Sequence, residues 1–173
     1  MEIERKFLPA RLPDNLGSYE HVELEQGYIS TMPVIRIRKK SSAKGEAHIL
    51  TVKSNGMMSR QEYELEISAD EYSNLLHKVD GNIIKKTRYM IPLSDLEASS
   101  NVDISGLTLE LDIFHDAFEG LVLAEIEFPD EKNARDYVPS DLFREETTYD
   151  RRFHNSNMSS MSASDIKAFI EGL

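Results

Sequence analysis

The sequence predicts a mainly β (α+β) fold, an eight-stranded antiparallel β-barrel tunnel with helices packed outside. Charged residues occupy alternate positions in short stretches between residues 2 and 127, and turn signals separate these stretches. Successive side chains of a strand point to opposite faces, so this alternation places acids and bases together on one face of a sheet. Eight antiparallel strands can close into a barrel whose interior holds one small ligand. We therefore expect the charged face to line that interior.

The strands are predicted from the alternation of charged and apolar residues, as in Glu2, Ile3 and Glu4. Glycine-containing pairs such as Asn55-Gly56 mark the loops between them. The predicted strands span residues 2–8, 21–30, 34–40, 47–54, 60–67, 83–92, 107–114 and 121–128.

Helical signals are fewer. Ser68 followed by Glu71 forms a capping box, which predicts a helix through Asp80 that covers the outer, apolar face of the sheet. Apolar residues at helical spacing predict another helix at the end of the chain. This C-terminal helix is predicted at about residues 162–173. Two further helical segments are predicted, one near residues 11–17 and one at 130–137.

Length and composition restrict the class of protein. A chain of 173 residues with 40% hydrophobic residues can bury a core, and we expect residues 1–173 to form a single domain. The sequence has no cysteine, which suits a reducing compartment and predicts a cytoplasmic location. No apolar stretch approaches the roughly 20 residues that span a bilayer, so no membrane partner is expected. The net charge of −11 disfavours nucleic acid, because the protein's field repels polyanions.

The inward-facing charges indicate the chemistry. Guanidinium and ammonium groups converging on a cavity suit the oxygens of a polyphosphate. Clustered carboxylates, without cysteine or paired histidines, suit Mg²⁺ or Mn²⁺. The candidate substrate-binding residues are Lys6, Arg36, Arg38, Lys53, Arg60, Lys86 and Arg88. The candidate metal ligands are Glu2, Glu4, Glu62, Glu64, Glu110, Asp112, Glu125 and Glu127.

Each charged stretch also has an ordinary explanation. A solvated strand face with cross-strand salt bridges, worth a fraction of a kcal/mol each, would show the same alternation. The joint occurrence of the stretches favours a functional interior instead. Sealing so many charges inside a purely structural barrel would cost more desolvation energy than ion pairing returns.

The spaced charged motifs resemble the signatures of the CYTH superfamily, the triphosphate tunnel metalloenzymes. Its Glu-x-Glu-x-Lys signature is matched by Glu2, Glu4 and Lys6. The later signatures follow in order as Arg36-x-Arg38, Thr51-x-Lys53, Arg60-x-Glu62-x-Glu64, Lys86-x-Arg88, Glu110-x-Asp112 and Glu125-x-Glu127. The resemblance covers residues 2–127 and implies an eight-stranded tunnel that hydrolyses triphosphates with a divalent metal. It also implies a first metal on Glu2, Glu4 and Glu125, with Glu62, Glu64 and Glu127 holding a second ion or the attacking water.

Residues of the second strand bear on the substrate. Thiamine-triphosphatase and class IV adenylyl cyclase relatives carry an Asp-x-Tyr type motif there, whereas this chain reads Glu25-Gln26-Gly27-Tyr28. That sequence is more similar to the short bacterial inorganic triphosphatases, and the similarity implies that Tyr28 and Lys53 act together. We expect Lys53 to stabilise the leaving oxygen, with Tyr28 orienting it by a hydrogen bond. Either Glu62 or Glu127 is expected to take the proton of the attacking water.

The expected activity is metal-dependent hydrolysis of inorganic tripolyphosphate to phosphate and pyrophosphate. The alternative enzymatic reading is hydrolysis of a nucleoside or thiamine triphosphate, or cyclisation of ATP as in a class IV adenylyl cyclase. A reading from another class is a non-catalytic polyphosphate-binding module, although simple capture of a polyanion gains nothing from carboxylates. The expected partner is a small-molecule triphosphate, bound by a monomer or homodimer.

Overall fold

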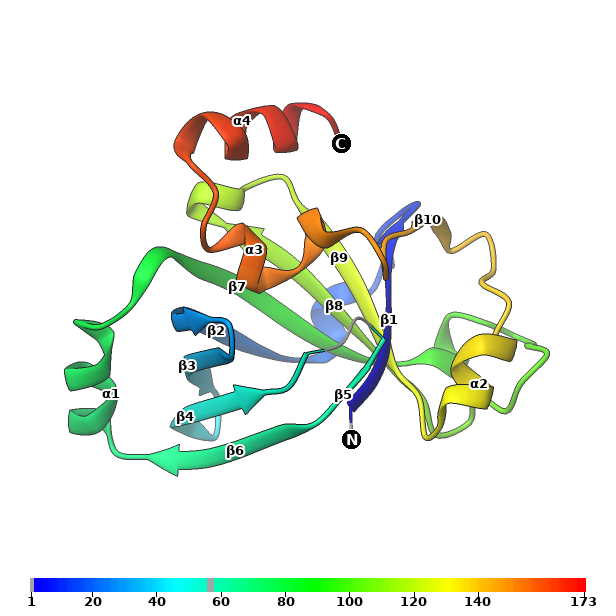
Figure 1. Ribbon diagram of the computed structural model, residues 1–173. Coiled ribbons are helices and arrows are strands. Elements are labelled where there is room, and N and C mark those ends of the chain that lie inside the picture. Colours follow the sequence, from blue (N-terminus) through cyan, green and yellow to red (C-terminus); the bar gives the residue numbers. More distant parts are fainter. Residues whose placement is uncertain (1, 56–57) are drawn as a thin grey trace.

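The computed structural model describes residues 2–55 and 58–173, which form one strongly curved antiparallel sheet with helices outside it (Figure 1). The strands of these residues are β1 (Glu2–Pro9), β2 (Glu20–Thr31), β3 (Val34–Ser42), β4 (Gly45–Lys53), β5 (Ser59–Arg60), β6 (Glu62–Ile67), β7 (Asp80–Pro92), β8 (Thr108–His115), β9 (Val122–Glu127) and β10 (Phe143–Glu146). The helices are α1 (Ala69–Leu76), α2 (Glu131–Asp136), α3 (Asn155–Met158) and α4 (Ala163–Glu171), with short 3₁₀ turns at Leu16–Ser18, Leu93–Asp95, Asp116–Phe118 and Arg151–Phe153.

The sheet curls into a nearly closed barrel. Its strand order is β10-β1-β9-β8-β7-β2-β3-β4-β6, and every pair is antiparallel. The short strand β5 pairs with β1, with Glu2 opposite Arg60, and leads through Gln61 directly into β6. Because β6 pairs with β4, this continuous segment joins the two ends of the curved sheet. The predicted fold class is therefore confirmed.

The number of strands differs from the prediction, because the described residues contain ten strands rather than eight. The predicted strand 60–67 is interrupted at Gln61, since its first part pairs with β1 and the remainder with β4. Strand β10 was not predicted, and it extends the sheet beyond the ring by pairing with residues 7–9 of β1. The loop expected at Asn55-Gly56 includes Gly56, which lies outside the described residues.

The helix predictions were accurate near the C-terminus and less so elsewhere. The capping box of α1 is present, but the helix ends at Leu76 rather than Asp80, because β7 begins at Asp80. It packs on β3 and β4 and buries Tyr72, so it covers only part of the outer surface. The predicted helix at 11–17 is reduced to a 3₁₀ turn, whereas α2 and α4 lie within their predicted ranges. The described helices include none that is both long and apolar enough for a membrane span.

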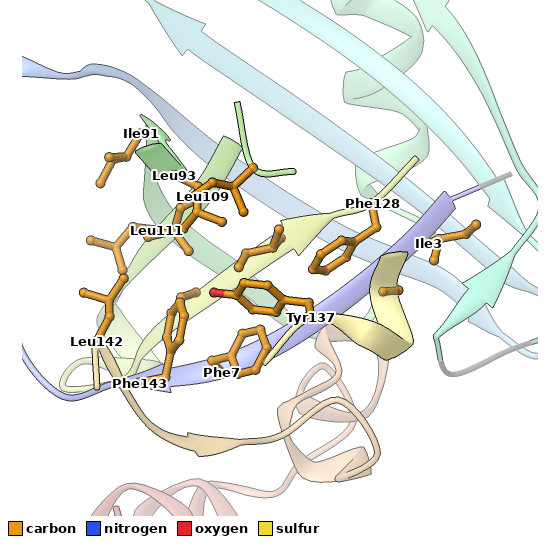
Figure 2. Packing of buried hydrophobic residues seen from close by; sticks show 14 residues of the cluster. Ile3, Phe7, Ile91, Leu93, Leu109, Leu111, Phe128, Tyr137, Leu142 and Phe143 are labelled. Carbon is orange, nitrogen blue, oxygen red and sulfur yellow. The ribbon is translucent and has the colours of Figure 1, made fainter. Parts of the chain in front are cut away.

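One apolar cluster covers the outside of the barrel at β1, β8 and β9. It includes Phe7, Leu111 and Ile126, whose side chains alternate with the inward-facing charges of β1, β8 and β9. The segment after α2 covers this face through Tyr137 and Phe143, and the rings of Phe7 and Phe143 stack with centroids 4.5 Å apart (Figure 2). This packing holds the charged face of the three strands toward the interior.

A second apolar cluster fills one end of the barrel interior. Leu8, Leu123 and Phe114 belong to it, and they continue the inward-facing positions of β1, β9 and β8 beyond the charged residues. Phe153 and Phe169, from the C-terminal segment that carries α3 and α4, pack against them. Figure 1 shows α3 and α4 together on one side of the barrel. The interior is thus closed by apolar packing at this end.

The C-terminal segment is fixed to the start of β7 by a close backbone contact. The Asn82 amide donates to the Ser159 carbonyl at 2.6 Å, and Gly81 has a φ of +81°. A Cβ atom on Gly81 would lie 2.0 Å from the Ser159 oxygen. Glycine therefore allows both the backbone conformation and the approach of the residue that follows α3.

We predict that Gly81→Ala destabilises the fold by about 3–5 kcal/mol, because strain at positive φ and a steric clash both contribute. The matched control is Gly45→Ala, since Gly45 has a φ of +122° but nothing lies within 4 Å of its added Cβ. That substitution should cost about 1–2 kcal/mol from strain alone. Urea unfolding measures both, and equal losses would show that the contact with Ser159 is unimportant.

Candidate functional site

The barrel interior contains a cavity of about 460 Å³ whose lining is almost entirely charged. Its acids are Glu2, Glu4, Glu62, Glu64, Glu110, Glu125 and Glu127. Its bases are Lys6, Arg36, Arg38, Lys40, Lys53, Arg60 and Arg88. The lining is completed by Asn155. Seven carboxylates therefore face seven cationic side chains, and the formal charge of the lining cancels.

Ion pairs tie the strands together where the barrel closes. The Lys53 Nζ lies 2.8 Å from a Glu2 oxygen and 3.0 Å from Glu62. Arg60 also reaches Glu2, with its Nε 2.8 Å from the carboxylate, and its Nη2 lies 2.7 Å from Glu4. These contacts join β4, β5 and β6 to β1. Burial, followed by Arg36, lowers the pKa of Lys53, and Glu2 opposes that shift.

A second network crosses β1, β9 and β7. Lys6 pairs with Glu125 and lies 2.9 Å from Glu4, while Arg88 Nη2 lies 2.6 Å from Glu125. Burial opposes the charge on Glu125, but Lys6 and Arg88 outweigh it and hold its pKa well below the ordinary value. Burial likewise opposes the charge on Lys6, yet Glu125 and Glu4 raise the pKa of that ammonium group. Both groups are therefore ionised at neutral pH.

Two predicted site residues lie behind the cavity rather than on it. Lys86 and Asp112 pair with each other, both side chains are completely buried, and neither lines the cavity. Asp112 also accepts a hydrogen bond of 2.6 Å from Arg88 Nε. Burial opposes its ionisation, but Arg88 and Lys86 lower its pKa. Lys86 was predicted to contact the substrate and Asp112 to bind a metal. Their position behind the cavity does not support these roles, because the ion pair between them already neutralises both charges.

Charge is unevenly distributed across the cavity. On β9, Glu127 has no ion pair within 4 Å among the described residues, and its pKa is raised by burial and by neighbouring carboxylates, chiefly Glu2 and Glu110. The pKa of Glu110 on β8 is also raised, first by burial, although it pairs with Arg88. We refer to Glu110 and Glu127 as the acidic wall. A carboxylate crowded by others favours its protonated form.

The opposite side of the cavity is basic. Arg38 and Lys40 of β3 have no carboxylate within 4 Å among the described residues. Burial, with Arg36 and Arg88, lowers the pKa of Arg38 to about 10, and burial followed by Arg38 lowers that of Lys40. The Nε of Arg36 is buried without a hydrogen-bond partner in the described part of the chain. We refer to Arg36, Arg38 and Lys40 as the basic wall. The strand order places β3 across the ring from β9.

Tyr28 does not occupy the position predicted for it. Its ring belongs to the apolar cluster that closes the barrel, where burial raises its pKa, and it does not line the cavity. The hydroxyl group accepts a hydrogen bond of 3.3 Å from Gln26 Nε2. No hydrogen bond joins Tyr28 to Lys53 in the described residues, because Glu2 and Glu62 hold the Lys53 ammonium group.

The structure adds two residues to the predicted site. Lys40 lines the cavity, and its position two residues after Arg38 is the sequence signal that could have identified it. Asn155 comes from α3 and has an Oδ1 atom that is buried without a partner among the described residues. It lies on a helix beyond the charged strands, so the alternation that identified the other residues could not reveal it.

The fold and the cavity define a class: a nearly closed β-barrel protein whose interior cavity holds equal numbers of acids and bases. The family described as the CYTH domain matches residues 1–153, and the chain therefore belongs to the CYTH family. An inorganic triphosphatase of Nitrosomonas europaea is 38% identical over 154 residues, covering 89% of this chain and 93% of that protein.

Two further comparisons agree. An inorganic triphosphatase of Acetivibrio thermocellus is 31% identical over 163 residues, covering 91% of this chain and 92% of that protein. A crystal structure of an inorganic triphosphatase aligns with a TM-score of 0.65 at 34% identity, covering 94% of this chain and 96% of that one. The predicted family is confirmed.

The raised pKa of Glu127 leads to a prediction about stability. Folding favours its protonated form, so ionising this group costs stability as the pH rises through its folded-state pKa. We predict that Glu127→Gln removes this cost and raises the melting temperature of the metal-free protein at pH 7 by about 1–3 °C. The rise is small because the Glu127 side chain is partly exposed and solvent screens its charge.

Most of the gain should disappear by about pH 4, just below the ordinary glutamate pKa, because the carboxyl is then largely neutral in both states. Glu119→Gln, at an exposed turn position, is the control and should change the melting temperature at neither pH. A Glu127→Gln protein that is less stable at pH 7, or a gain that persists at pH 4, would contradict the crowding of carboxylates at the acidic wall.

Proposed function

We propose that this protein hydrolyses inorganic tripolyphosphate to phosphate and pyrophosphate in the charged cavity, with Mg²⁺ or Mn²⁺ bound together with the substrate. The observation that carries the proposal is the equal number of carboxylates and cations on the cavity lining. The family and the names of two similar relatives support the same activity.

Charge balance separates this function from simple anion capture. A module that only bound polyphosphate would need a surplus of cations, because carboxylates repel the ligand. Here the seven carboxylates of the lining equal its seven cationic side chains in number, so its formal charges sum to zero. A triphosphate with several negative charges is therefore neutralised only if cations accompany it. The carboxylate oxygens of the lining then bind the cations, and the basic wall binds the phosphates.

The acidic wall fits a hard divalent cation. The described residues contain no ready-made group of three or more side chains at metal-ligating geometry. Four carboxylates from three strands nevertheless lie near Glu127 and raise its pKa, namely those of Glu2, Glu110, Glu4 and Glu62. Such oxygen donors suit Mg²⁺ and Mn²⁺, which take few protein ligands and complete their shell with water and phosphate. A bound cation would neutralise charge on the phosphoryl oxygens and acidify water.

The side chains of the chain itself have separable roles in this proposal. The basic wall binds the phosphate oxygens, because Arg38 and Lys40 carry no carboxylate partner. Lys53 is buried and close to Glu62, and its Nζ donates a hydrogen bond to the leaving pyrophosphate. Glu127 accepts the proton of the attacking water at its carboxylate, since it has no competing ion pair among the described residues and a raised pKa. Glu62 is less suited to this role because it already pairs with Arg36 and Lys53.

The cavity lining disfavours the larger organic triphosphates. The described residues of the lining are charged side chains and Asn155, and none of them is an aromatic or aliphatic residue against which a base or a thiazole ring could stack. Four further properties of the protein stay predictions. They are its single-domain organisation, its monomeric or homodimeric state, its cytoplasmic location and the absence of nucleic acid and membrane partners.

The direct test is a product screen. We predict that inorganic tripolyphosphate with Mg²⁺ or Mn²⁺ releases phosphate and pyrophosphate in equal amounts, at least about tenfold faster than ATP or thiamine triphosphate, because the lining offers those organic groups no stacking surface. Chelation of the metal should abolish turnover. Preferred hydrolysis of either organic triphosphate would contradict the substrate assignment, and tight binding of tripolyphosphate without turnover would support a binding module.

A substitution separates the role of Lys53 from ground-state binding. We predict that Lys53→Met lowers kcat about 100-fold while KM changes less than about threefold, because a donor to the leaving group acts mainly in the transition state. The fold should survive, since Glu2 retains Arg60 and Glu62 retains Arg36 as partners. Lys44→Ala, on an 83% exposed side chain, is the control. A variant with normal kcat would show that Lys53 is not catalytic.

A further inference from the structure

One inward-facing arginine is held by a neutral partner instead of a carboxylate. Arg38 Nε donates a hydrogen bond of 3.0 Å to Oε1 of Gln26, which lies directly opposite on β2. The Gln26 side chain is completely buried. The other bases of the lining that are as deeply buried all pair with acids: Lys6 with Glu4 and Glu125, Arg36 with Glu62 and Glu64, Lys53 with Glu2 and Glu62, and Arg88 with Glu110, Asp112 and Glu125.

The orientation of the Gln26 amide follows from its two neighbours. A guanidinium group only donates hydrogen bonds, so the amide oxygen must face Arg38. The amide nitrogen then faces Tyr28, whose hydroxyl oxygen accepts at 3.3 Å. Tyr28 is itself buried in the apolar cluster that also contains Ile84 and Phe114. A rigid ring thus fixes a buried amide, which in turn fixes the Arg38 guanidinium.

A neutral partner has a different electrostatic consequence from a carboxylate. It satisfies one guanidinium N–H without cancelling the charge, and the remaining N–H groups of Arg38 stay available at the cavity, which this residue lines. Glutamate would fill almost the same volume but would pair with Arg38. The remaining charge is costly, since burial and the neighbouring arginines lower the pKa of Arg38 to about 10. An anion entering the cavity relieves this cost.

We infer that Gln26 is a positioning residue that keeps Arg38 uncompensated for binding the triphosphate, and that Tyr28 acts through Gln26 rather than with Lys53. The inference rests on the proposed function for the identity of the anion. Arg38 touches the substrate, whereas Gln26 and Tyr28 determine where its guanidinium lies and what charge it presents.

The test is titration calorimetry with inorganic tripolyphosphate on the metal-free full chain, alongside steady-state hydrolysis with Mg²⁺. We predict that Gln26→Glu weakens binding at pH 8 about tenfold or more and raises KM similarly, with kcat changed less than about threefold, because the new carboxylate pairs with Arg38. The ratio of variant to wild-type affinity should recover as the pH falls through the pKa of the new carboxyl, since a protonated carboxyl is again neutral.

The matched control is Gln61→Glu, at the chain's other glutamine, which is exposed between β5 and β6. It adds the same charge outside the cavity and should leave binding within about twofold of the wild type. Far-ultraviolet circular dichroism and thermal melting show whether each variant is folded.

Two further variants keep the inference testable if Gln26→Glu does not fold. Gln26→Met removes the amide without adding charge and should weaken binding about threefold to tenfold, with no recovery at low pH. Tyr28→Phe should raise KM and leave kcat nearly unchanged, and combining it with Gln26→Met should add little, because both changes release the same guanidinium.

Each outcome has a defined meaning. Binding by Gln26→Glu within twofold of the wild type, or a loss that is the same at every pH, overturns the inference. A Tyr28→Phe protein that loses kcat with unchanged KM also overturns it and assigns Tyr28 to Lys53. Wild-type protein that binds tripolyphosphate without hydrolysing it overturns the proposed function alone. Wild-type protein that neither binds tripolyphosphate without metal nor hydrolyses it with Mg²⁺ overturns both.

Discussion

The structure depends on compensation of the charges inside the barrel. Removing an ion from water costs several kcal/mol unless a partner lies close, so a lining of seven acids and seven bases is tolerated only as a network. Most of its members are paired across strands, and Glu2 and Arg60 form such a pair where β5 meets β1. The ion pairs therefore do more than neutralise charge. They fix the segment that brings the two ends of the sheet together.

In the proposed function, the side chains without an ion-pair partner locate the chemistry. Glu127 is crowded by carboxylates on one wall, and Arg38 and Lys40 lack carboxylates on the other. A metal–triphosphate complex has the complementary arrangement, because its cations and its phosphate oxygens are separate. Binding then exchanges protein ion pairs for contacts with the ligand, and little new desolvation is required. The apolar cluster of Leu8, Phe114 and their neighbours keeps one end of this interior closed.

Much of this arrangement could be predicted from the sequence, because the side-chain period of a strand is fixed at two residues. Once Glu2, Glu4 and Lys6 are placed on one face, the remaining inward positions follow from the same alternation in each strand. The ion-pair partners of these side chains could not be predicted in this way, since they depend on which residues the strand register brings together. Nothing in the sequence around Lys53 indicates that Glu2, some fifty positions earlier, holds it instead of Tyr28.

The strand ends and the contributions of other elements were also beyond local patterns. Gln61 fits the alternation of the predicted strand 60–67, and only the competing partners β1 and β4 divide that strand. Lys86 and Asp112 share the inward face with Arg88, but they lie deeper and satisfy each other. Asn155 reaches the cavity from α3, whose position depends on tertiary packing of the C-terminal segment.

The most direct test of the account is a crystal structure of the protein with tripolyphosphate and Mn²⁺, whose anomalous scattering locates the metal. The account predicts Mn²⁺ at the acidic wall beside Glu127, the phosphate chain along Arg38 and Lys40, and separation of the Lys53 Nζ from the Glu2 carboxylate, now 2.8 Å apart. A complex in which these protein ion pairs remain intact and the triphosphate lies outside the barrel would contradict it.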